Sequence, residues 1–250
     1  MNIHNNFKRS YDEDGFCVIK EFFSKTEIKE LNHKIKRFLK NKSKNLKGKD
    51  INRINNKKIN TMHDIDKHDL FFKKFSKKKY ILDTAKILLN STPHFRKCEM
   101  FAKPAKIGLA SPFHQDNYLW AVKNQNGLTF WVALDHCNKK NGGLTYYSSS
   151  HKFGLLEHED SYAPGTSQKI KNRILKYKLK KSKKITPKLN PGDVLIHHCM
   201  IVHGSNINKS NKSRRGFTIQ FKDKKSGYDL NLLKHYKQRL KHQLKIRNQI

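Results

Sequence analysis

Three polar side chains in two separate stretches have the types and spacing to hold a metal ion. The segment SPFHQDNYLW carries His114 and Asp116, and GDVLIHHCMIVHGS carries His203 at the end of an apolar run. Residues two apart on a β-strand point to the same face, so an imidazole and a carboxylate can be aimed at one point. Two histidines and one carboxylate on one face of an octahedral metal are typical of non-haem Fe(II) oxygenases, because three positions stay open.

The His-x-Asp spacing alone is a weak signal, because the chain has 14 histidines and a second copy at His158 to Asp160. The first copy follows a turn bounded by proline and leads into aromatic residues, whereas the second lies in a polar stretch without alternation. We therefore assign the metal to the first copy. The alternative is a barrel in which these polar groups satisfy one another without a metal.

Two arginines open the strand-like segment RRGFTIQF, and Arg214 lies eleven residues after His203. A guanidinium at this place can bind a dicarboxylate co-substrate through paired, charge-assisted hydrogen bonds. Arg214 and Arg215 face opposite sides of a strand, so these residues alone leave open which one faces the site.

The elements that must position these residues begin near residue 97, where short apolar runs are separated by Gly, Asn and Pro. Such runs predict an antiparallel sandwich or barrel, with its core over about 97–222. The runs are KCEMFAKP, GLTFWVALDHC, GGLTYYSSS, DVLIHHCMIVHGS and RRGFTIQFK. The lysine-rich stretch 166–186 is predicted to be a surface insertion.

The N-terminal part predicts helical support over about 24–90. DGFCVIKEFF reads as a strand ending near Phe23, and SKTE offers Ser24 as an N-cap with a glutamate three places on. A helix is predicted over 25–40 and a second one within 76–90. The residues expected to face inward on the second helix are Ile81, Ala85, Leu88 and Leu89.

Two lysine-rich segments receive different predictions. Residues 41–60 carry little apolar content and are predicted to form a mobile, solvated loop. Residues 228–247 predict a basic amphipathic helix packed on the barrel, with a contact for a partner or an acidic surface as the alternative. The residues expected to make that packing are Leu232, Leu233, Tyr236 and Leu240.

The 250 residues suit a single domain over 1–250. The apolar stretches fall short of the roughly 18 residues that a membrane span needs, and the first fifteen residues contain no apolar signal region, so we expect a soluble, cytoplasmic protein. The four cysteines are scattered without a C-x-x-C pair, which argues against disulfides and a zinc knuckle. Oligomeric state cannot be read from the sequence.

The formal net charge is +34, from 54 Lys plus Arg against 20 Asp plus Glu, and such a balance raises nucleic acid or an anionic membrane surface as a partner. The excess is spread over the whole chain together with abundant Asn and Ile, which favours a general compositional drift. We therefore expect no specific nucleic-acid partner, only non-specific binding at low salt.

The motifs together resemble the phytanoyl-CoA dioxygenase family of Fe(II)/2-oxoglutarate oxygenases, which includes ectoine hydroxylase. The resemblance rests on DGFCVIKEFFSKTEIKEL, FHQDNYLW, WVALDHCNKKNGGLTYYSSSHKFGLLEH, PGDVLIHHCMIVHGSN and RRGFTIQF, and it covers about residues 10–222. It implies a mainly β fold with flanking helices, a double-stranded β-helix of the jelly-roll, cupin-like kind.

The resemblance also implies site residues. His114, Asp116 and His203 would be the iron ligands, Arg214 would bind the distal carboxylate of 2-oxoglutarate, and Ser205 would add a hydroxyl contact. Arg215 remains the alternative to Arg214. His198 matches a histidine that the family carries before the ligand, so neither His197 nor His198 is taken as a ligand. The family often has Pro-Gly-Ser-His where this chain has Ser148, Ser149, Ser150 and His151, a change at a turn without ligands.

The implied activity is hydroxylation of a C–H bond of a small molecule, with 2-oxoglutarate and O2 converted to succinate and CO2. Retention of Asp116 favours hydroxylation, because halogenating relatives replace this carboxylate with a small residue. Rival interpretations are a basic nucleic-acid-binding protein, a nucleic-acid demethylating dioxygenase and a barrel without turnover.

The substrate pocket has several candidate residues, each with a structural alternative. The candidates next to the metal pair are Asn117, Tyr118 and Trp120, and those on the preceding strand are Phe101 and Lys103. Trp131 is predicted to be core rather than a substrate contact. Lys103 would touch 2-oxoglutarate or an anionic substrate, or else be solvated. The basic surface mildly favours an anionic substrate, and nothing in the sequence selects among acyl thioesters, amino-acid-like solutes and natural-product intermediates.

Overall fold

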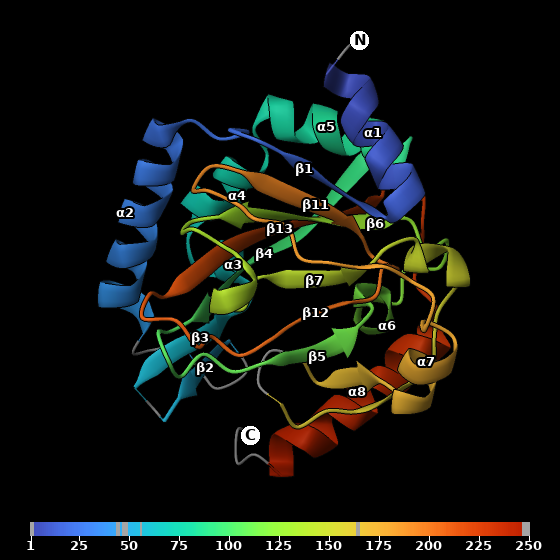
Figure 1. The fold of residues 1–250 in the computed structure, drawn as a ribbon. Coiled ribbons are helices and arrows are strands. Elements are labelled where there is room, and N and C mark those ends of the chain that lie inside the picture. Colours follow the sequence, from blue (N-terminus) through green and yellow to red (C-terminus); the bar gives the residue numbers. More distant parts are fainter. Residues whose placement is uncertain (1–2, 44–45, 47–49, 56, 164–165, 247–250) are drawn as a thin grey trace.

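The computed structural model describes residues 3–43, 46, 50–55, 57–163 and 166–246, and its framework is a pair of antiparallel β-sheets (Figure 1). The larger sheet has the strand order β1-β11-β6-β13-β4-β3-β2 and the smaller one β10-β7-β12-β5, and β8 pairs with β9 beside them. The larger sheet contains β1 (Phe16–Ile19), β2 (Ile51–Ile54), β3 (Lys58–Met62), β4 (Pro93–Lys103), β6 (Gly127–Ala133), β11 (Val194–His198) and β13 (Arg214–Asp223). The other strands are β5 (Ser111–His114), β7 (Leu144–Tyr147), β8 (His158–Asp160), β9 (Gln168–Ile170), β10 (Lys184–Ile185) and β12 (His203–Ser205).

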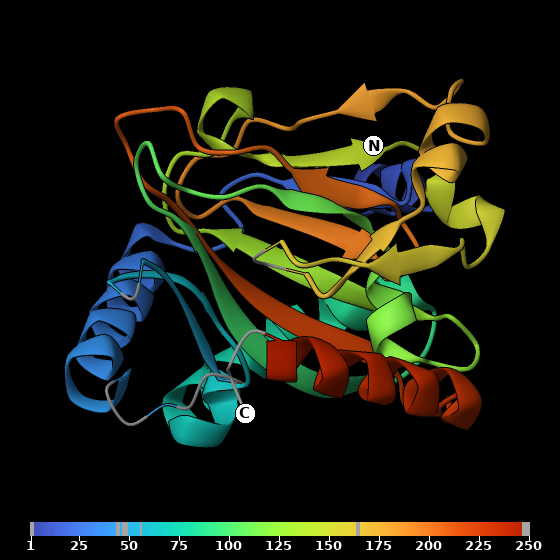
Figure 2. The ribbon, with the colours of Figure 1, turned by 90° about the horizontal axis from the view of Figure 1, so that it is seen from below.

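Helices flank these sheets. They are α1 (Ile3–Asp14), α2 (Lys25–Lys42), α3 (Ile65–His68), α4 (Leu70–Ser76), α5 (Lys79–Leu89), α6 (Asp116–Trp120), α7 (Asn172–Tyr177) and α8 (Leu230–Ile246). One buried cluster joins side chains of α1 to α5 with one face of the larger sheet, so these helices cover that face. Helix α8 lies outside the sheets, near α6 (Figures 1 and 2). None of the helices within the described residues is long and apolar enough to cross a membrane.

The two long central strands show how the larger sheet separates a core face from a polar face. On β13, Phe217, Ile219 and Phe221 belong to the cluster under the helices. The alternate residues therefore point to the other side of the sheet, toward the smaller sheet. The neighbouring strand β4 repeats this pattern, with Cys98 and Met100 facing the helices. The face turned toward the smaller sheet is where a cavity forms.

Helix α2 confirms the capping prediction. The hydroxyl of Ser24 accepts from the backbone N–H of Glu27, and the Glu27 carboxylate accepts from the backbone N–H of Ser24. The helix within 76–90 is confirmed as α5, and the four residues expected to face inward are buried. The strand predicted to end near Phe23 is shorter, as β1, and α1 was not predicted.

The prediction of a solvated loop over 41–60 is wrong for its described part. The strands β2 and β3 form a hairpin there, and β3 pairs with β4 through Thr61 and Met62. Hydrophilic composition misled the prediction, because the alternate residues of this hairpin face a polar cavity rather than an apolar core. Residues 44–45, 47–49 and 56 lie outside the described residues.

The stretch 166–186 is only in part a surface insertion. It contains β9 and α7, and β10 joins the smaller sheet, where Lys184 pairs with Tyr147. The predicted C-terminal helix is present as α8, and the residues expected to pack are partly buried.

Candidate metal centre and cavity

His114, Asp116 and His203 converge at one end of the smaller sheet. His114 ends β5 and pairs with His203 of β12, so hydrogen-bonded strands bring the two imidazoles together across 89 positions of sequence. Asp116 is the first residue of α6, not a strand residue as predicted. One ligand atom from each side chain lies within 4.8 Å of the others. The Asp116 Oδ1 atom lies 3.7 Å from Nε2 of His114 and 3.8 Å from Nε2 of His203.

In both imidazoles, Nε2 is the nitrogen that can bind a cation. Nδ1 of His114 donates to the carbonyl of Pro112 at 2.8 Å, and Nδ1 of His203 donates to the carbonyl of Ile201 at 3.1 Å. These bonds assign the tautomer that leaves each Nε2 with a lone pair. Burial lowers the pKa of His114, and it lowers the pKa of His203 well below its ordinary value. Both rings are therefore neutral near pH 7, as metal ligands must be.

The two oxygens of the Asp116 carboxylate have different surroundings: Oδ2 accepts hydrogen bonds from the framework, and Oδ1 faces the two imidazoles. Oδ2 accepts from the hydroxyl of Thr129 at 3.0 Å and from Nε2 of His197 at 3.2 Å. His197 is fixed in turn by the hydroxyl of Tyr146, 3.0 Å from its Nδ1. Burial alone would raise the pKa of Asp116, but the bond from His197 and the nearby imidazoles outweigh it and lower that pKa. The carboxylate is therefore ionised, with Oδ1 directed to the histidines.

The second His-x-Asp copy supports the first instead of competing with it. Nε2 of His158 accepts the backbone N–H of Gln115, the residue between the first pair, at 3.1 Å. Burial lowers the pKa of His158 to about 3, so this nitrogen keeps its lone pair. Asp160 accepts from Arg239 and Gln243 of α8. The copy therefore anchors the loop before α6 and the helix α8.

A cavity of about 640 Å³ opens beside the three side chains. The polar face of β4, β6 and β13 forms one wall, the smaller sheet contributes the metal-ligand candidates, and α8 adds Tyr236, Leu240 and Leu244. Such a volume is in the range of small-molecule sites. The role of α8 as a wall was not predicted from the sequence.

The structure distinguishes the two arginines. Arg214 is 1% exposed and lines the cavity, where its guanidinium lies 5.1 Å from the ring centre of Trp131 and donates from Nη2 to the carbonyl of Gly142. Its Nε has no hydrogen-bond partner among the described residues. Arg215 faces the other way and forms a bidentate pair with Asp135, at 2.9 and 2.7 Å.

A glycine makes the place of Trp131 possible. A Cβ on Gly216 would lie 2.0 Å from Cζ2 of Trp131, far inside van der Waals contact. Gly216 follows Arg214 by two residues and therefore shares its face of β13. Trp131 belongs to a buried cluster, as predicted, and lines the cavity as well.

Ser205 and Lys103 lie near Arg214. Ser205 is buried on β12, and Lys103 pairs with Arg214 in the register of β4 and β13. Lys103 Nζ donates to the carbonyls of Leu109 and Asn206. Burial, and then the charge of Arg214, lower the pKa of Lys103 to about 6. All three side chains line the cavity, so this end combines the guanidinium of Arg214, a lysine that is mostly neutral at pH 7 and a hydroxyl.

The remaining pocket candidates divide into two groups. Phe101 and Trp120 line the cavity. Asn117 instead closes α6, with its side-chain amide bonded to both backbone groups of Val122 at 3.1 and 3.2 Å. Tyr118 stacks on His158 at a ring distance of 4.2 Å and accepts from Arg239. Neither residue lines the cavity, and both make contacts within the framework, so a contact of Asn117 or Tyr118 with substrate stays a prediction.

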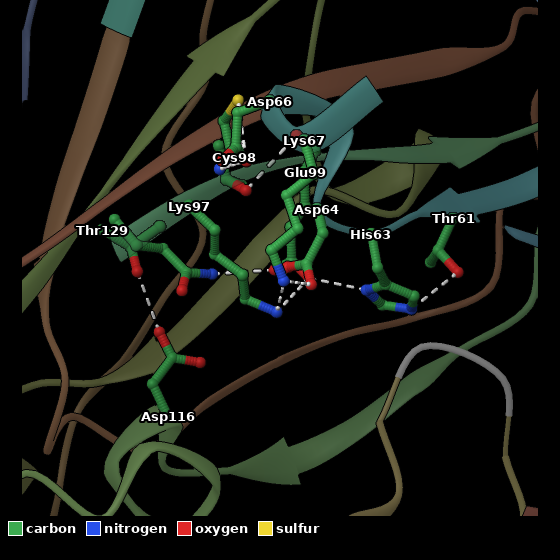
Figure 3. Close-up of polar contacts among 12 residues, drawn as sticks. Thr61, His63, Asp64, Asp66, Lys67, Lys97, Cys98, Glu99, Asp116 and Thr129 are labelled. Atoms are coloured by element: carbon green, nitrogen blue, oxygen red, sulfur yellow. Dashed lines mark hydrogen bonds and ion pairs between the residues drawn. The ribbon is translucent and has the colours of Figure 1, made fainter. Parts of the chain in front are cut away.

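A buried polar network forms the cavity wall on β4 (Figure 3). The Glu99 carboxylate lies 2.6 Å from Nδ1 of His63 and 2.7 Å from Nζ of Lys97, and it accepts from Gln220 at 2.8 Å. Lys97 also lies 3.4 Å from Asp64. Burial alone would raise the pKa of Glu99, but Lys97 and His63 lower it to about 2.

This network was missed in the sequence. The signal that could have revealed it is the alternation in KCEMFAK, where Lys97, Glu99 and Lys103 lie on the same face of the strand as Phe101 and the intervening residues are apolar. Thr129 was also missed, because a threonine inside the apolar run GLTFWVALD resembles ordinary strand composition.

Comparison with known proteins agrees with this geometry. The family model described as phytanoyl-CoA dioxygenase (PhyH) matches residues 11–216. The peroxisomal phytanoyl-CoA dioxygenase of Bos taurus is 23% identical over 88% of this chain and 69% of its own length. The matches to the mouse and human enzymes cover only 36% and 32% of those proteins. A probable alpha-ketoglutarate-dependent hypophosphite dioxygenase of Stutzerimonas stutzeri is 21% identical over 86% of this chain and 77% of its length.

Solved structures share the fold. EctD from S. alaskensis superposes with a TM-score of 0.75 at 19% identity, covering 89% of this chain and 77% of that one. The carbocyclase SnoK from nogalamycin biosynthesis gives 0.75 at 19% identity, covering 91% and 87%. The predicted jelly-roll class is thereby confirmed. With the family model matching most of its length, the chain belongs to the phytanoyl-CoA dioxygenase family and is a 2-oxoglutarate-dependent oxygenase.

Proposed function

We propose that this oxygenase binds Fe(II) through His114, Asp116 and His203 and hydroxylates a C–H bond of a small molecule. The observation that carries the proposal is the convergence of two neutral Nε2 atoms and one anionic Oδ1 within 4.8 Å of one another beside a cavity. A set of two imidazoles and one carboxylate suits ferrous iron and leaves part of its coordination sphere to other ligands. Iron held there would supply the redox chemistry that O2 and 2-oxoglutarate require.

The co-substrate site is proposed at Arg214. Its buried guanidinium keeps an unpartnered Nε among the described residues, and a buried donor of this kind costs free energy unless a ligand satisfies it. The distal carboxylate of 2-oxoglutarate fits this donor, with Ser205 and Lys103 on the same stretch of the cavity wall. With its pKa lowered to about 6, Lys103 is mostly neutral at pH 7 in the free protein, which leaves Arg214 as the permanent charge.

The framework around the cavity has two further tasks. Thr129 and His197 hold the carboxylate so that one oxygen stays directed at the metal position. Leu240 and Leu244 of α8 cover the cavity with apolar side chains and reduce its access to bulk water. Hydroxylation is preferred to halogenation because Asp116 occupies the position that a halide would need.

The test begins with anaerobic titration of Fe(II) into the protein, followed by 2-oxoglutarate. We expect one iron site and a weak visible charge-transfer band on addition of 2-oxoglutarate. Asp116→Asn should abolish iron binding, whereas the matched variant Asp160→Asn, in the second His-x-Asp copy, should retain it. Loss in both variants, or no band in folded and iron-loaded protein, would contradict the proposal.

The reaction type has its own experiment. The iron-loaded enzyme is incubated with 2-oxoglutarate, O2 and a metabolite extract, and products are examined by mass spectrometry. A species that gains one oxygen atom, with matching formation of succinate, is expected. A product that gains a halogen, or that changes without gaining oxygen, would replace hydroxylation by another outcome.

A further inference from the structure

The cavity contains a second cationic position, away from Arg214, and a β-bulge creates it. On β4, Lys97 pairs with Gln220 and Phe95 pairs with Phe221, so the register shifts and Arg96 is the extra residue. Phe95 packs against the core under the helices, whereas both Arg96 and Lys97 line the cavity. A bulge is a known way to re-aim a side chain next to a functional site.

The two neighbouring cations differ in their partners. Lys97 is neutralised by Glu99 at 2.7 Å and by Asp64 at 3.4 Å. Arg96 forms no ion pair with any described acidic residue, and its Nε and Nη1 atoms are buried without a hydrogen-bond partner in that part of the chain. Burial lowers the pKa of Arg96, as expected for a cation that lacks a counter-charge.

Arg96 is held in a defined position despite lacking a polar partner. Its guanidinium lies 4.3 Å from the ring centre of Trp120, the last residue of α6. Because α6 begins with Asp116, this stacking ties Arg96 to the same short helix as one proposed metal ligand. The guanidinium is therefore preorganised for a planar, charge-assisted contact.

Gln220 adds a second unsatisfied group on this wall. Its Nε2 donates to Glu99 at 2.8 Å, which fixes the orientation of the amide. Its Oε1 then remains buried without a partner among the described residues. Gln220 pairs with Lys97 in the strand register, so a free acceptor lies on the strand beside the bulge. The nearby wall is apolar, from Leu119 of α6 and Leu240 of α8.

We propose that Arg96 binds an anionic group of the substrate, a carboxylate or a phosphate monoester, while Gln220 accepts a hydrogen bond from a hydroxyl or amine on the same molecule. The substrate is thus a small organic acid with an apolar body. This inference rests on the proposed oxygenase function and adds the substrate class to it. The anion neutralises Arg96, a cavity cation that forms no ion pair with the described acidic residues and lies apart from the 2-oxoglutarate position proposed at Arg214.

The experiment uses the two tryptophans of the chain as separate reporters. Trp131 lies under Arg214, so the variant Trp131→Phe leaves Trp120, under Arg96, as the only source of tryptophan emission. The protein is loaded with Fe(II) and saturating 2-oxoglutarate without O2. It is then titrated with hexanoate, hexyl phosphate, hexanamide and hexan-1-ol. Comparison of the two acids separates a carboxylate site from a phosphate site.

We expect saturable changes in Trp120 emission, with one of the acids binding at least about tenfold more tightly than its neutral analogue, the usual size of a charge-assisted contact. Arg96→Gln should remove this preference and Arg96→Lys should retain part of it. Arg37→Gln removes the same charge from an exposed position on α2 and should change nothing. Equal binding of acids and neutral analogues, or a preference that survives in Arg96→Gln, would overturn the inference.

A parallel assay keeps the two proposals separate. Conversion of 2-oxoglutarate to succinate is measured in the wild-type protein with O2 and without added substrate. Conversion without any Arg96-dependent anion binding refutes the inference alone. Arg96-dependent binding without conversion, even after addition of the acids, refutes the oxygenase function and leaves an anion site.

Discussion

The hydroxyl of Thr129 donates to Oδ2 of Asp116 at 3.0 Å, while Oδ1 of the same carboxylate faces the two imidazoles. Metal affinity should therefore depend on a residue that does not touch the metal. Removing an outer hydrogen bond of this kind typically costs about 10- to 100-fold in affinity. We expect Thr129→Val to weaken Fe(II) binding by about tenfold or more.

The control for this prediction is Thr218→Val, which makes the same chemical change on the adjacent strand β13, where the hydroxyl donates to the carbonyl of Glu99. Fe(II) affinity is measured by competition with a chelator of known affinity. Similar iron affinity in Thr129→Val and the wild type would mean that His197 alone orients the carboxylate.

The two arginines should separate co-substrate binding from stability. Arg214→Met removes the buried cavity cation and should raise the 2-oxoglutarate dissociation constant by at least about tenfold, with iron binding retained. Arg215→Met breaks the pair with Asp135 and should lower thermal stability without changing that constant. Titration of the charge-transfer band and calorimetric unfolding measure the two effects. If Arg215→Met raised the 2-oxoglutarate dissociation constant and Arg214→Met did not, Arg215 would be the residue that binds the co-substrate.

Lys103 should make 2-oxoglutarate binding take up a proton. Its pKa of about 6 in the free protein means that the amine is mostly neutral at pH 7.5. A carboxylate bound beside it raises that pKa, so the amine gains a proton on binding. Calorimetry in buffers of different ionisation enthalpy should detect this uptake, and Lys103→Met should lack it.

The lowered pKa of Lys103 in the free protein also sets the pH range in which proton uptake occurs. Uptake should fade as the pH falls below about 6, where the free amine already carries its proton. Equal proton uptake by the wild type and Lys103→Met would show that the titrating group lies elsewhere.

Glu99 should contribute acid-sensitive stability. Its pKa is lowered from 4.5 to about 2 in the folded protein, so the unfolded state binds more protons over this window. The stabilisation is present above pH 4.5 and is lost as the pH falls toward 2. We therefore expect the difference in unfolding free energy between wild type and Glu99→Gln to shrink on acidification. Urea titrations at several pH values measure it, and a constant difference would exclude the ionised network as its source.

The sequence was sufficient for elements whose local chemistry and burial agree. Ser24 and Glu27 cap α2 as their types predict, and α5 has an apolar face that matches its packing. His114 and His203 could be paired in advance because neighbouring strands place them together. The orientation of Arg214 and Arg215 could also have been read from the sequence. Phe217, Ile219 and Phe221 share the face of Arg215 by alternation, and their apolar side chains mark that face as the core side.

The rest depended on tertiary context. The hairpin of β2 and β3 has hydrophilic residues because it borders a polar cavity, so composition suggested a loop. Asn117 and Tyr118 were placed near substrate by adjacency to Asp116, but α6 turns their side chains toward Val122 and His158. The position of Arg96 at the cavity depends on a β-bulge in β4, which no local sequence pattern predicts.

Helix α8 supplies part of the cavity wall from a segment that follows every strand in the chain. The three metal-binding candidates lie on β5, β12 and α6, so detachment of α8 alone would open this side of the pocket without separating the paired strands that carry the two histidines. Local opening of one helix would thus change access to the space where the organic acid would lie and leave the iron position assembled.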